Sequence, residues 1–268
     1  MATLIDVINN SLDDNSKQPF SVYTSVEEQR LLNVPIAKPL LIVVLSGYKE
    51  LGVNSDITCE AGQFIFLPSD SAIDMRNIPQ TNRYFALLIE FDHEDFAGLQ
   101  INGVSAKKHY IGKTSPTLMA CLQQFVESAK WAPSQILSSR KRELLTLLCH
   151  LGHTDILSLL ANPQLKDRLH NMFINQPGCE LSVQAICQKL AMSESTLRRK
   201  LKQESTSVQE IKDKARLGLG LHLLQTTKHP VGIIADKCGY QSQSRFTERF
   251  KKQFGLTPSE LRKTQVAE

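Results

Sequence analysis

Short apolar runs, separated by turn-forming residues, follow one another along the chain after residue 36. The runs that predict strands are Leu40–Leu45, Ile57–Cys59, Phe64–Leu67 and Tyr84–Phe91. Glycine, proline, asparagine and aspartate stand between them, a combination typical of antiparallel strands in a sandwich or a small barrel. Residues 1 to 36 show no such pattern and are expected to be irregular or partly helical.

From Ser115 onward the apolar positions recur with the period of an α-helix. The sets that share a helical face are Leu118, Leu122, Phe125 and Val126, then Leu144, Leu145, Leu147 and Leu148, then Ile156, Leu159 and Leu160. Two arrangements would bury such a stripe. The helices can pack on the predicted strands, or they can pair with a second copy of the chain in a homodimer.

The C-terminal part of the chain contains two helix–turn–helix patterns, at 181–203 and 231–254. Each predicts a short supporting helix, a tight turn and a second helix with an exposed polar face. In the first pattern Ser182 and Ser193 stand at the N-cap positions of the two helices, and Ala191-Met192 forms the turn. The positions predicted to be buried are Val183, Ile186, Leu190, Leu197 and Leu201.

The second pattern repeats this arrangement with a glycine in the turn. Gly239 stands where a helix end needs a positive φ, and Ser242 is the expected N-cap of the next helix. Gly255 ends that helix, and Thr257-Pro258 begins the last one. The positions predicted to be buried are Ile233, Ile234, Cys238, Phe246, Phe250 and Phe254.

One long helix, Val208–Thr226, is predicted between the two patterns. The apolar positions that share one register in it are Ile211, Ala215, Leu219 and Leu223. Such a helix would fix the spacing of the two exposed helices, which should lie roughly 34 Å apart to reach successive major-groove faces of duplex DNA. Gly218 and Gly220 each cost a helix about 1 kcal/mol, so mobility or close packing is expected there.

The exposed helix faces carry side chains that suit DNA recognition. In the first unit Ser195, Arg198, Arg199 and Lys202 lie at i, i+3, i+4 and i+7. Arginine can contact guanine O6 and N7 in a bidentate manner, worth roughly 1–3 kcal/mol of discrimination. The outward positions of the second unit are Gln241, Ser244, Arg245 and Glu248. Phosphate contacts are expected from Lys202, Arg249, Lys251 and Lys252.

The distribution of charge agrees with a polyanion partner. The chain has 268 residues, which suffices for two domains, and a net charge of +4. From Pro163 onward it carries 18 Lys and Arg against 10 Asp and Glu, whereas the preceding part carries 13 against 17. We therefore expect an acidic domain at 1–160 and a basic domain at 161–268, with the boundary at Asn162-Pro163.

Several classes of protein are disfavoured by the sequence. It lacks a run of eighteen apolar residues and the features of a secretion signal, which predicts a cytoplasmic protein without a membrane partner. The cysteines and histidines lack the spacing of zinc ligands, and paired acid–base residues and a phosphate-binding glycine loop are missing. We therefore expect no metal, no cofactor and no enzymatic activity.

A set of motif residues resembles the signature of the AraC/XylS transcription regulators. These residues are Arg216-Leu217, Leu223-Leu224, Thr227, Ile234-Ala235, Gly239-Tyr240, Ser244, Phe246, Phe250-Lys251, Gly255 and Thr257-Pro258. The resemblance implies a sequence-specific regulator that binds double-stranded DNA. It also implies activation of transcription by recruitment of RNA polymerase, which is usual in that family.

The resemblance assigns roles to the exposed residues. The side chains that would read bases are Ser195, Arg198 and Arg199 in the first unit, and Ser244, Arg245 and Glu248 in the second. Glu248 departs from the family, which commonly has arginine there. Because glutamate can accept from cytosine N4 but repels phosphate, Arg249 or Arg245 would take the backbone contact.

The N-terminal half resembles the short cupin-like sensor domain of one AraC-type branch. The matching segments are Pro39–Lys49, Glu60-Ala61-Gly62 and Arg83–Asp92. The first histidine is His93, so a metal-binding cupin is disfavoured. The implied fold class is α+β: a cupin-like β-barrel or sandwich with packed helices, then an all-α domain of two helix–turn–helix units joined by a linker helix.

Such a domain could hold a small molecule, contact a protein or dimerise. Apolar strand faces near Lys38, Lys49, Arg76 or Arg83 would suit an organic acid or a fatty acid as effector. The alternative is an effector-independent regulator whose N-terminal domain binds an anti-activator or another regulator.

Overall fold

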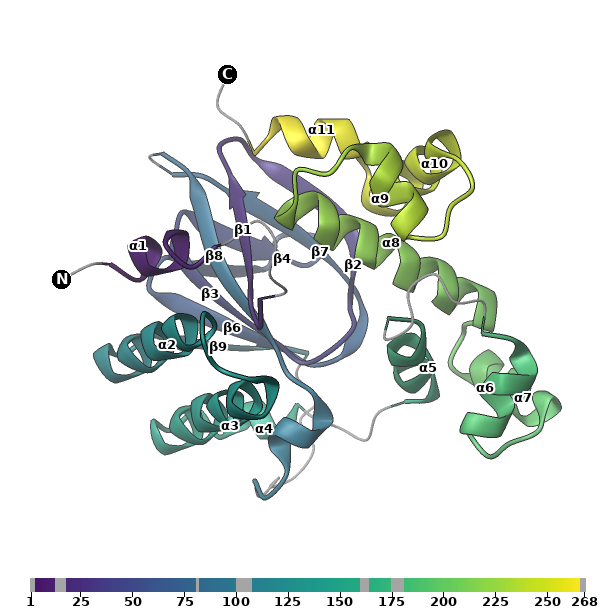
Figure 1. Ribbon diagram of the computed structural model, residues 1–268, viewed down its shortest axis with the longest axis horizontal. Coiled ribbons are helices and arrows are strands. Elements are labelled where there is room, and N and C mark those ends of the chain that lie inside the picture. Colours follow the sequence, from purple (N-terminus) through teal and green to yellow (C-terminus); the bar gives the residue numbers. More distant parts are fainter. Residues whose placement is uncertain are drawn as a thin grey trace. The chain divides into compact units, whose positions relative to one another are not determined.

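The computed structural model describes residues 3–12, 18–80, 82–99, 108–159, 164–174 and 181–265. It forms two units, drawn in Figure 1. One comprises Met1–Gln29, Lys38–Pro68 and Arg76–Ala161, and the other comprises Arg30–Ala37, Ser69–Met75 and Asn162–Glu268. The predicted boundary at Asn162-Pro163 and the predicted helix position Leu160 lie outside the described residues.

The strands of the described residues form two sheets. They are β1 Ser21–Ser25, β2 Gln29–Ile36, β3 Leu40–Ser46, β4 Tyr48–Leu51, β5 Ile57–Glu60, β6 Gln63–Leu67, β7 Asp70–Ile78, β8 Tyr84–Glu90 and β9 Tyr110–Lys113. Their orders are β1-β8-β3-β6-β9 and β2-β7-β4-β5. The predicted sandwich is confirmed. The barrel alternative is wrong, because in the described part of the chain the two sheets do not join into one closed sheet.

Strands β3, β5, β6 and β8 coincide with the predicted apolar runs. The expectation for residues 1 to 36 is correct only for helix α1, Leu4–Asn9, and wrong for β1 and β2. Both strands mix buried and more exposed positions, and Gln29 is among the buried ones. These two strands were not predicted because neither contains a continuous apolar run. The same reason applies to β4, β7 and β9.

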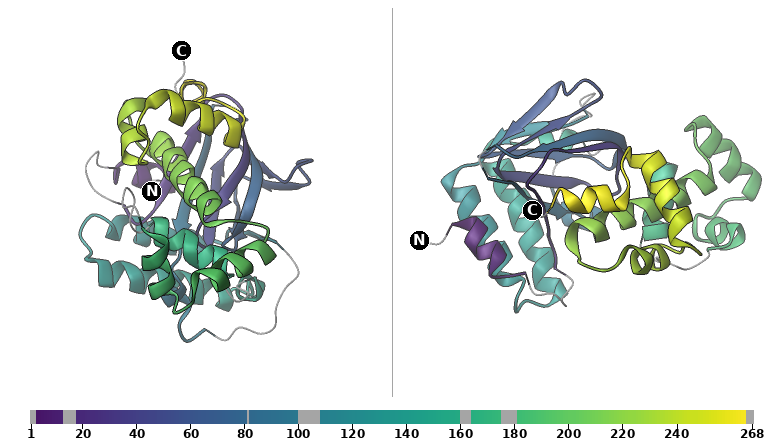
Figure 2. Two further views of the ribbon diagram at one scale, coloured as in Figure 1. Left: turned by 90° about the vertical axis from the view of Figure 1, so that its right-hand side faces the viewer. Right: turned by 90° about the horizontal axis from the view of Figure 1, so that it is seen from above.

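Helices cover one face of the five-stranded sheet. Beside α1 they are η1 His93–Phe96, α2 Pro116–Ser128, α3 Ser134–His150 and α4 Asp155–Ser158. Figure 2 shows α2 and α3 side by side next to the sheet. Leu122 and Leu145 share a core with Val43, Phe64 and Leu87 of the strands. The predicted helical stripe is therefore buried within the chain, the first of the two predicted arrangements.

The second unit carries the helices of the C-terminal part. They are α5 Leu165–Ile174, α6 Val183–Lys189, α7 Glu194–Gln203, α8 Val208–Thr226, α9 Val231–Lys237, α10 Gln243–Phe254 and α11 Pro258–Lys263. Helix α8 contacts α5, α9, α10 and α11. In Figure 1 α6 and α7 lie at one end of α8, and α9 and α10 lie along its other part. The predicted pair of helix–turn–helix units with a linker helix is confirmed.

Two different faces of α8 are buried along its length. Ile211 and Ala215 belong to the core of the first helix–turn–helix unit. The buried positions further along are Leu217, Gly220, Leu221 and Leu224. The predicted single register is wrong after Ala215, since Leu219 and Leu223 are only half-buried. The buried face changes because α8 completes two cores that lie on different sides of it.

Gly220 allows α8 and α10 to approach each other closely. A Cβ atom at this position would lie 2.7 Å from Cε2 and 2.8 Å from Cζ of Phe246, and 3.4 Å from Sγ of Cys238. The Phe246 ring is fully buried and packs against Phe250, with the ring centroids 5.5 Å apart. Close packing, one of the two predicted explanations, therefore accounts for this glycine.

Gly220→Ala should lower the free energy of unfolding by about 1–2 kcal/mol, because overpacking against Phe246 outweighs the gain in helix propensity. Gly232→Ala in α9 is the matched control. The atom nearest to a Cβ at this position would be Oε1 of Gln243, at 3.1 Å, at the end of a side chain that can move aside. The free energy of unfolding should therefore stay the same or rise. Urea unfolding of both variants measures the difference, and equal effects would contradict the close approach.

Candidate DNA interface and candidate effector site

The first helix–turn–helix unit consists of α6 and α7. Ser182 Oγ accepts a hydrogen bond from the backbone N–H of Ala185 at 3.1 Å, and Ser193 Oγ accepts from that of Thr196 at 3.3 Å. Both predicted N-caps are confirmed. The turn contains Ala191 at a φ of 51°, a left-handed conformation that lets the chain reverse between the two helices.

The inner side of α7 fixes its orientation. Leu197 is fully buried in one core with Ile186 of α6. Directly after α7, the Glu204 carboxylate accepts from the backbone N–H groups of Leu165 and Lys166 at 3.0 and 2.8 Å. Because these donors are at the start of α5, where a helix lacks internal partners, Glu204 caps α5 and ties it to the end of α7.

The outer side of α7 presents Ser195, Arg198, Arg199 and Lys202, and all four side chains are exposed. Arg198 donates to Glu194 Oε1 from Nε at 2.9 Å and from Nη2 at 2.5 Å. Glu194 was not among the predicted residues, although its i, i+4 spacing to Arg198 signals such a pair. An exposed pair contributes only about 0–1 kcal/mol, so Arg198 can exchange Glu194 for a phosphate or a base at little cost.

The second unit, α9 and α10, is delimited by glycine and serine. Gly239 has a φ of 76° and Gly255 a φ of 85°, in the left-handed region that glycine adopts without strain. Ser242 Oγ accepts from the backbone N–H of Arg245 at 3.3 Å, and Thr257 begins α11 with a capping box. The predicted start and end of the second recognition helix are therefore confirmed.

The predicted buried face of α9 is wrong at one position. Ile234 and Cys238 are buried, but Ile233 is 45% exposed. Helix α9 has seven residues, and positions four apart already fill its contact with the core. The neighbouring isoleucine therefore faces solvent.

A row of aromatic rings orients α10. Phe246, Phe250 and Phe254 are fully buried, and neighbouring ring centroids lie 5.5 and 4.6 Å apart. The opposite side of the helix is therefore exposed. It carries Ser244, Arg245, Glu248, Arg249, Lys251 and Lys252. Side chains expected at bases and side chains expected at phosphates thus lie on the solvent side of the same helix.

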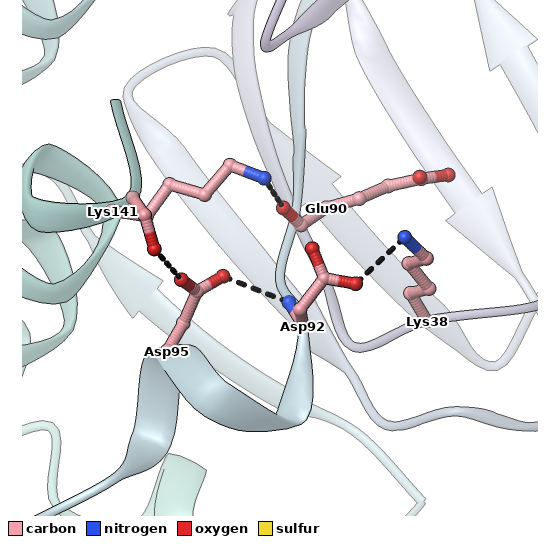
Figure 3. A network of polar contacts seen from close by, with 6 residues as sticks. Lys38, Glu90, Asp92, Asp95 and Lys141 are labelled. Carbon is pink, nitrogen blue, oxygen red and sulfur yellow. Dashed lines mark hydrogen bonds and ion pairs between the residues drawn. The ribbon is translucent and has the colours of Figure 1, made fainter. Parts of the chain in front are cut away.

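Lys38, the first predicted effector residue, belongs to a polar network at the end of β8 (Figure 3). Its Nζ lies 2.7 Å from Asp92 Oδ1. The backbone N–H of Asp92 donates to Asp95 Oδ2 at 2.8 Å, and Lys141 of α3 donates to the backbone oxygen of Glu90 at 2.6 Å. The network ties β8 and η1 to α3, and the Lys38 ammonium is already paired with a carboxylate of the chain.

Arg76 and Arg83 have partners at the surface of the sandwich. Arg76 lies 2.7 Å from the Glu28 carboxylate and 2.6 Å from that of Glu50. Arg83 is exposed, and its guanidinium carbon lies 4.9 Å from the centroid of the Phe85 ring. These two side chains are therefore held at the surface rather than in the interior.

Lys49 of β4 is the buried member of the predicted effector set, with 2% of its surface exposed. Its Nζ donates to Asn77 Oδ1 and lies 5.5 Å from the centroid of the Tyr84 ring. Burial lowers the pKa of Lys49 to about 7, and the nearby Cys59 thiol acts in the opposite direction. A lysine that changes charge near neutral pH is typical of functional sites.

In the described part of the chain, no group of three or more histidine, cysteine and acidic side chains is arranged to hold a metal ion. Among the same residues, no helix combines the length and the apolar character needed to cross a membrane.

Known regulators resemble the chain in sequence. Residues 186–264 match the family described as a helix-turn-helix domain. The HTH-type transcriptional regulator GadX of Escherichia coli is 31% identical over 134 residues, which are 48% of this chain and 49% of GadX. The regulator YdeO of Escherichia coli is 35% identical over 109 residues, 40% of this chain and 43% of YdeO. The chain spans about half the length of the curated relatives it matches.

The fold resembles that of ToxT from Vibrio cholerae along nearly the whole chain. An apo variant of ToxT matches with a TM-score of 0.69 at 13% identity, covering 95% of this chain and 100% of ToxT. Wild-type ToxT bound to an unsaturated fatty acid matches with a TM-score of 0.67 at 15% identity, covering 96% and 99%. At this identity the likeness shows the shared fold.

Lys49→Met should raise the free energy of unfolding by about 1 kcal/mol at pH 6, because the cost of a buried ammonium is removed while Asn77 Oδ1 loses its donor, which offsets part of the gain. The unfolded chain keeps this proton up to its ordinary pKa of 10.5, whereas the folded chain loses it near pH 7. The stability of the unmodified protein therefore rises by up to about 1.4 kcal/mol per pH unit above pH 7, and the advantage of the variant shrinks.

Urea unfolding at pH 6, 7, 8 and 9 would measure this trend. Lys113→Met, at an exposed position of β9, is the control and should show no such dependence. An advantage of Lys49→Met that stays constant from pH 6 to 9 would show that the ammonium is not the source of the cost.

Proposed function

We propose that the protein is a sequence-specific regulator of transcription of the AraC type, because residues 186–264 match a helix-turn-helix family and the regulators GadX and YdeO are similar to this chain. It binds double-stranded DNA through α7 and α10 and is controlled through its N-terminal sandwich. The observation that carries this proposal is the similar build of α7 and α10 within one unit. Each has an apolar inner face and an exposed face rich in arginine and lysine.

The DNA contacts divide into two groups. The base-reading side chains are Ser195, Arg198, Arg199, Ser244, Arg245 and Glu248, and the phosphate-binding ones are Lys202, Arg249, Lys251 and Lys252. Their common exposure supports contact with DNA. Helix α10 contacts α8, and α7 shares the first core with Ile211 and Ala215 of α8. Base edges supply the sequence information, whereas phosphates supply affinity and orientation.

The two domains have separate tasks. Residues 161–268 bind DNA, and residues 1–160 sense the effector and pair with a second copy of the chain. By its resemblance to the AraC/XylS regulators, the protein acts in the cytoplasm as an activator that recruits RNA polymerase.

The effector is a small organic acid or a fatty acid. ToxT, which shares the fold, has been crystallised with an unsaturated fatty acid and with a naphthalenyl butenoic acid. In this chain Lys49 is the buried member of the proposed effector set. Lys38 and Arg76 are paired with carboxylates of the chain, and Arg83 lies exposed beside the Phe85 ring.

A second candidate function is an effector-independent regulator whose N-terminal domain binds an anti-activator or another regulator. Trp131, between α2 and α3, is 67% exposed, and Ile136 in the first turn of α3 is 41% exposed. Large apolar side chains exposed in the same turn region favour a protein contact. Titration of the full chain with acids, compared with affinity capture of partners by wild type and Trp131→Ala, distinguishes the two.

Arg199→Ala should weaken binding to the operator by about 1–3 kcal/mol and relax the preference at one half-site, because a base contact is lost. Lys252→Ala should weaken binding to all DNA about evenly and reduce the slope of log K against log salt by about 1. Genome-wide occupancy of the full chain supplies the operator, and fluorescence anisotropy at several salt concentrations measures both effects.

Lys113→Ala, on β9 of the sandwich, is the control for loss of a positive charge outside the assigned faces of α7 and α10. Unchanged operator binding by both Arg199→Ala and Lys252→Ala would refute the assigned faces. Occupancy without discrete peaks sharing a bipartite motif would refute a sequence-specific regulator.

A further inference from the structure

A pocket lies between α5 and α7, on a side of the first helix–turn–helix unit to which the sequence assigns no role. Its volume is about 430 Å³. The lining is mostly polar and includes Arg168 of α5, Lys200 and Gln203 of α7, and Glu204 directly after α7. Because pockets for small molecules are lined mainly by apolar side chains, this lining favours a charged partner that stays in contact with water.

The apolar side of α5 holds this helix against the first helix–turn–helix unit. Leu169 of α5 shares a core with Leu197 and Leu201 of α7. The Glu204 carboxylate also accepts from two backbone N–H groups at the start of α5, at 3.0 and 2.8 Å. Arg168 is at an exposed position of the same helix. Its guanidinium group is therefore carried by a helix whose position beside α7 is fixed.

The two cations of the pocket lack carboxylate partners. In the part of the chain that the structure describes, neither Arg168 nor Lys200 forms an ion pair. By contrast, Arg198 on the base-reading face is paired with Glu194. The acidic member of the lining, Glu204, is already hydrogen-bonded to the backbone of α5. Two like charges in one pocket repel each other, so an anion that contacts both is favoured there.

The pocket adjoins the face of α7 that is assigned to bases. Successive residues of an α-helix are rotated by about 100°, so Lys200 lies next to Arg199 around the helix axis. Gln203 follows Arg199 by four residues and lies on the same side one turn later. The exposed surface of α7 thus continues from Arg199 through Gln203 and Lys200 to Arg168 on α5.

We propose that this pocket binds the sugar–phosphate backbone of the DNA beside the half-site read by α7, with Arg168 and Lys200 contacting phosphate oxygens. Gln203 adds a neutral amide donor between these cations and the base-reading face. The inference rests on the proposed function, since it adds a contact to the same DNA complex. It makes α5, a helix outside both helix–turn–helix patterns, a third element that contacts DNA.

The dimensions of DNA assign the pocket to phosphates rather than to bases. The major groove of B-DNA is about 12 Å wide and admits one α-helix. With α7 in the groove, α5 must lie outside it, where the backbone is. The guanidinium fork of Arg168 matches the geometry of phosphate oxygens, and Lys200 supplies a point charge. Phosphates recur at every nucleotide, so these contacts add affinity and orient α7 without changing the sequence preference.

Fluorescence anisotropy of the full-length protein, on the operator and on a scrambled duplex of equal length, tests the proposal. Arg168→Gln and Lys200→Gln should each weaken binding to both duplexes about threefold to tenfold, because a phosphate contact is lost. Each should reduce the slope of log K against log salt by about 0.9, and the double variant by about 1.8. The preference for the operator should stay at the wild-type level.

Lys263→Gln is the matched control for loss of a charge from the same domain. Lys263 is exposed on α11, which contacts α8 and α10. This variant should bind both duplexes as wild type does. Urea unfolding confirms that each variant is folded, and the exposure of Arg168 and Lys200 predicts that both substitutions leave the fold intact.

Operators with single methylphosphonate linkages, which lack the phosphate charge, locate the contact. The half-site read by α7 is the one at which Arg199→Ala relaxes the preference. Beside it, one or more replaced linkages should weaken wild type about threefold to tenfold and leave the double variant unaffected. Linkages beside the other half-site should affect wild type and the double variant equally.

Three outcomes separate this site from the regulator itself. A wild-type protein that prefers the operator, with variants that bind as it does or with every replaced linkage affecting the double variant equally, overturns the α5 site alone. Equal binding of operator and scrambled duplex by wild type, weakened by both substitutions, overturns the sequence-specific regulator alone. Absence of DNA binding by the wild-type protein overturns both.

Discussion

The C-terminal domain depends on α8, because this helix completes the cores that hold α7 and α10. Ile211 and Ala215 complete the first core, and Gly220 admits the Phe246 ring into the second. The supporting helices α6 and α9 have seven residues each, too few to be stable by themselves. Helix α8 therefore turns two marginal helix pairs into one domain in which α7 and α10 keep fixed orientations.

Local chemistry made a large part of this fold predictable from the sequence. The Ser193 and Ser242 caps and the left-handed Gly255 are decided within a few residues, and five successive positions of β3 are buried. Strands such as β2 could not be predicted in this way. Gln29 is buried there because Asn77, far along the chain, donates to it, and no local pattern contains that partner.

The candidate sites divide along the same line. The exposed face of α7 follows from the period of the helix, once Leu197 is taken as buried. The sequence does not show which effector candidate is buried, since Lys38 and Lys49 flank the same apolar run. The structure distinguishes them through residues distant in the chain. Asp92 pairs with Lys38 at the surface, and Asn77 Oδ1 accepts a hydrogen bond from Lys49 in the interior.

For the proposed regulator, the attachment of α7 and α10 to α8 also constrains the spacing of the DNA half-sites. The 19-residue helix α8 contacts α10 and shares the first core with α7, so in the proposed complex neither helix can turn about the DNA axis without the other. Each added base pair rotates one half-site by roughly 34–36° relative to the other, because B-DNA completes a turn in 10–10.5 base pairs. A single inserted base pair would move the second half-site out of reach of its helix, although every base remained correct. A whole inserted turn would restore the angle but not the distance. Under this proposal, the length of the spacer between the half-sites is part of what the protein recognises.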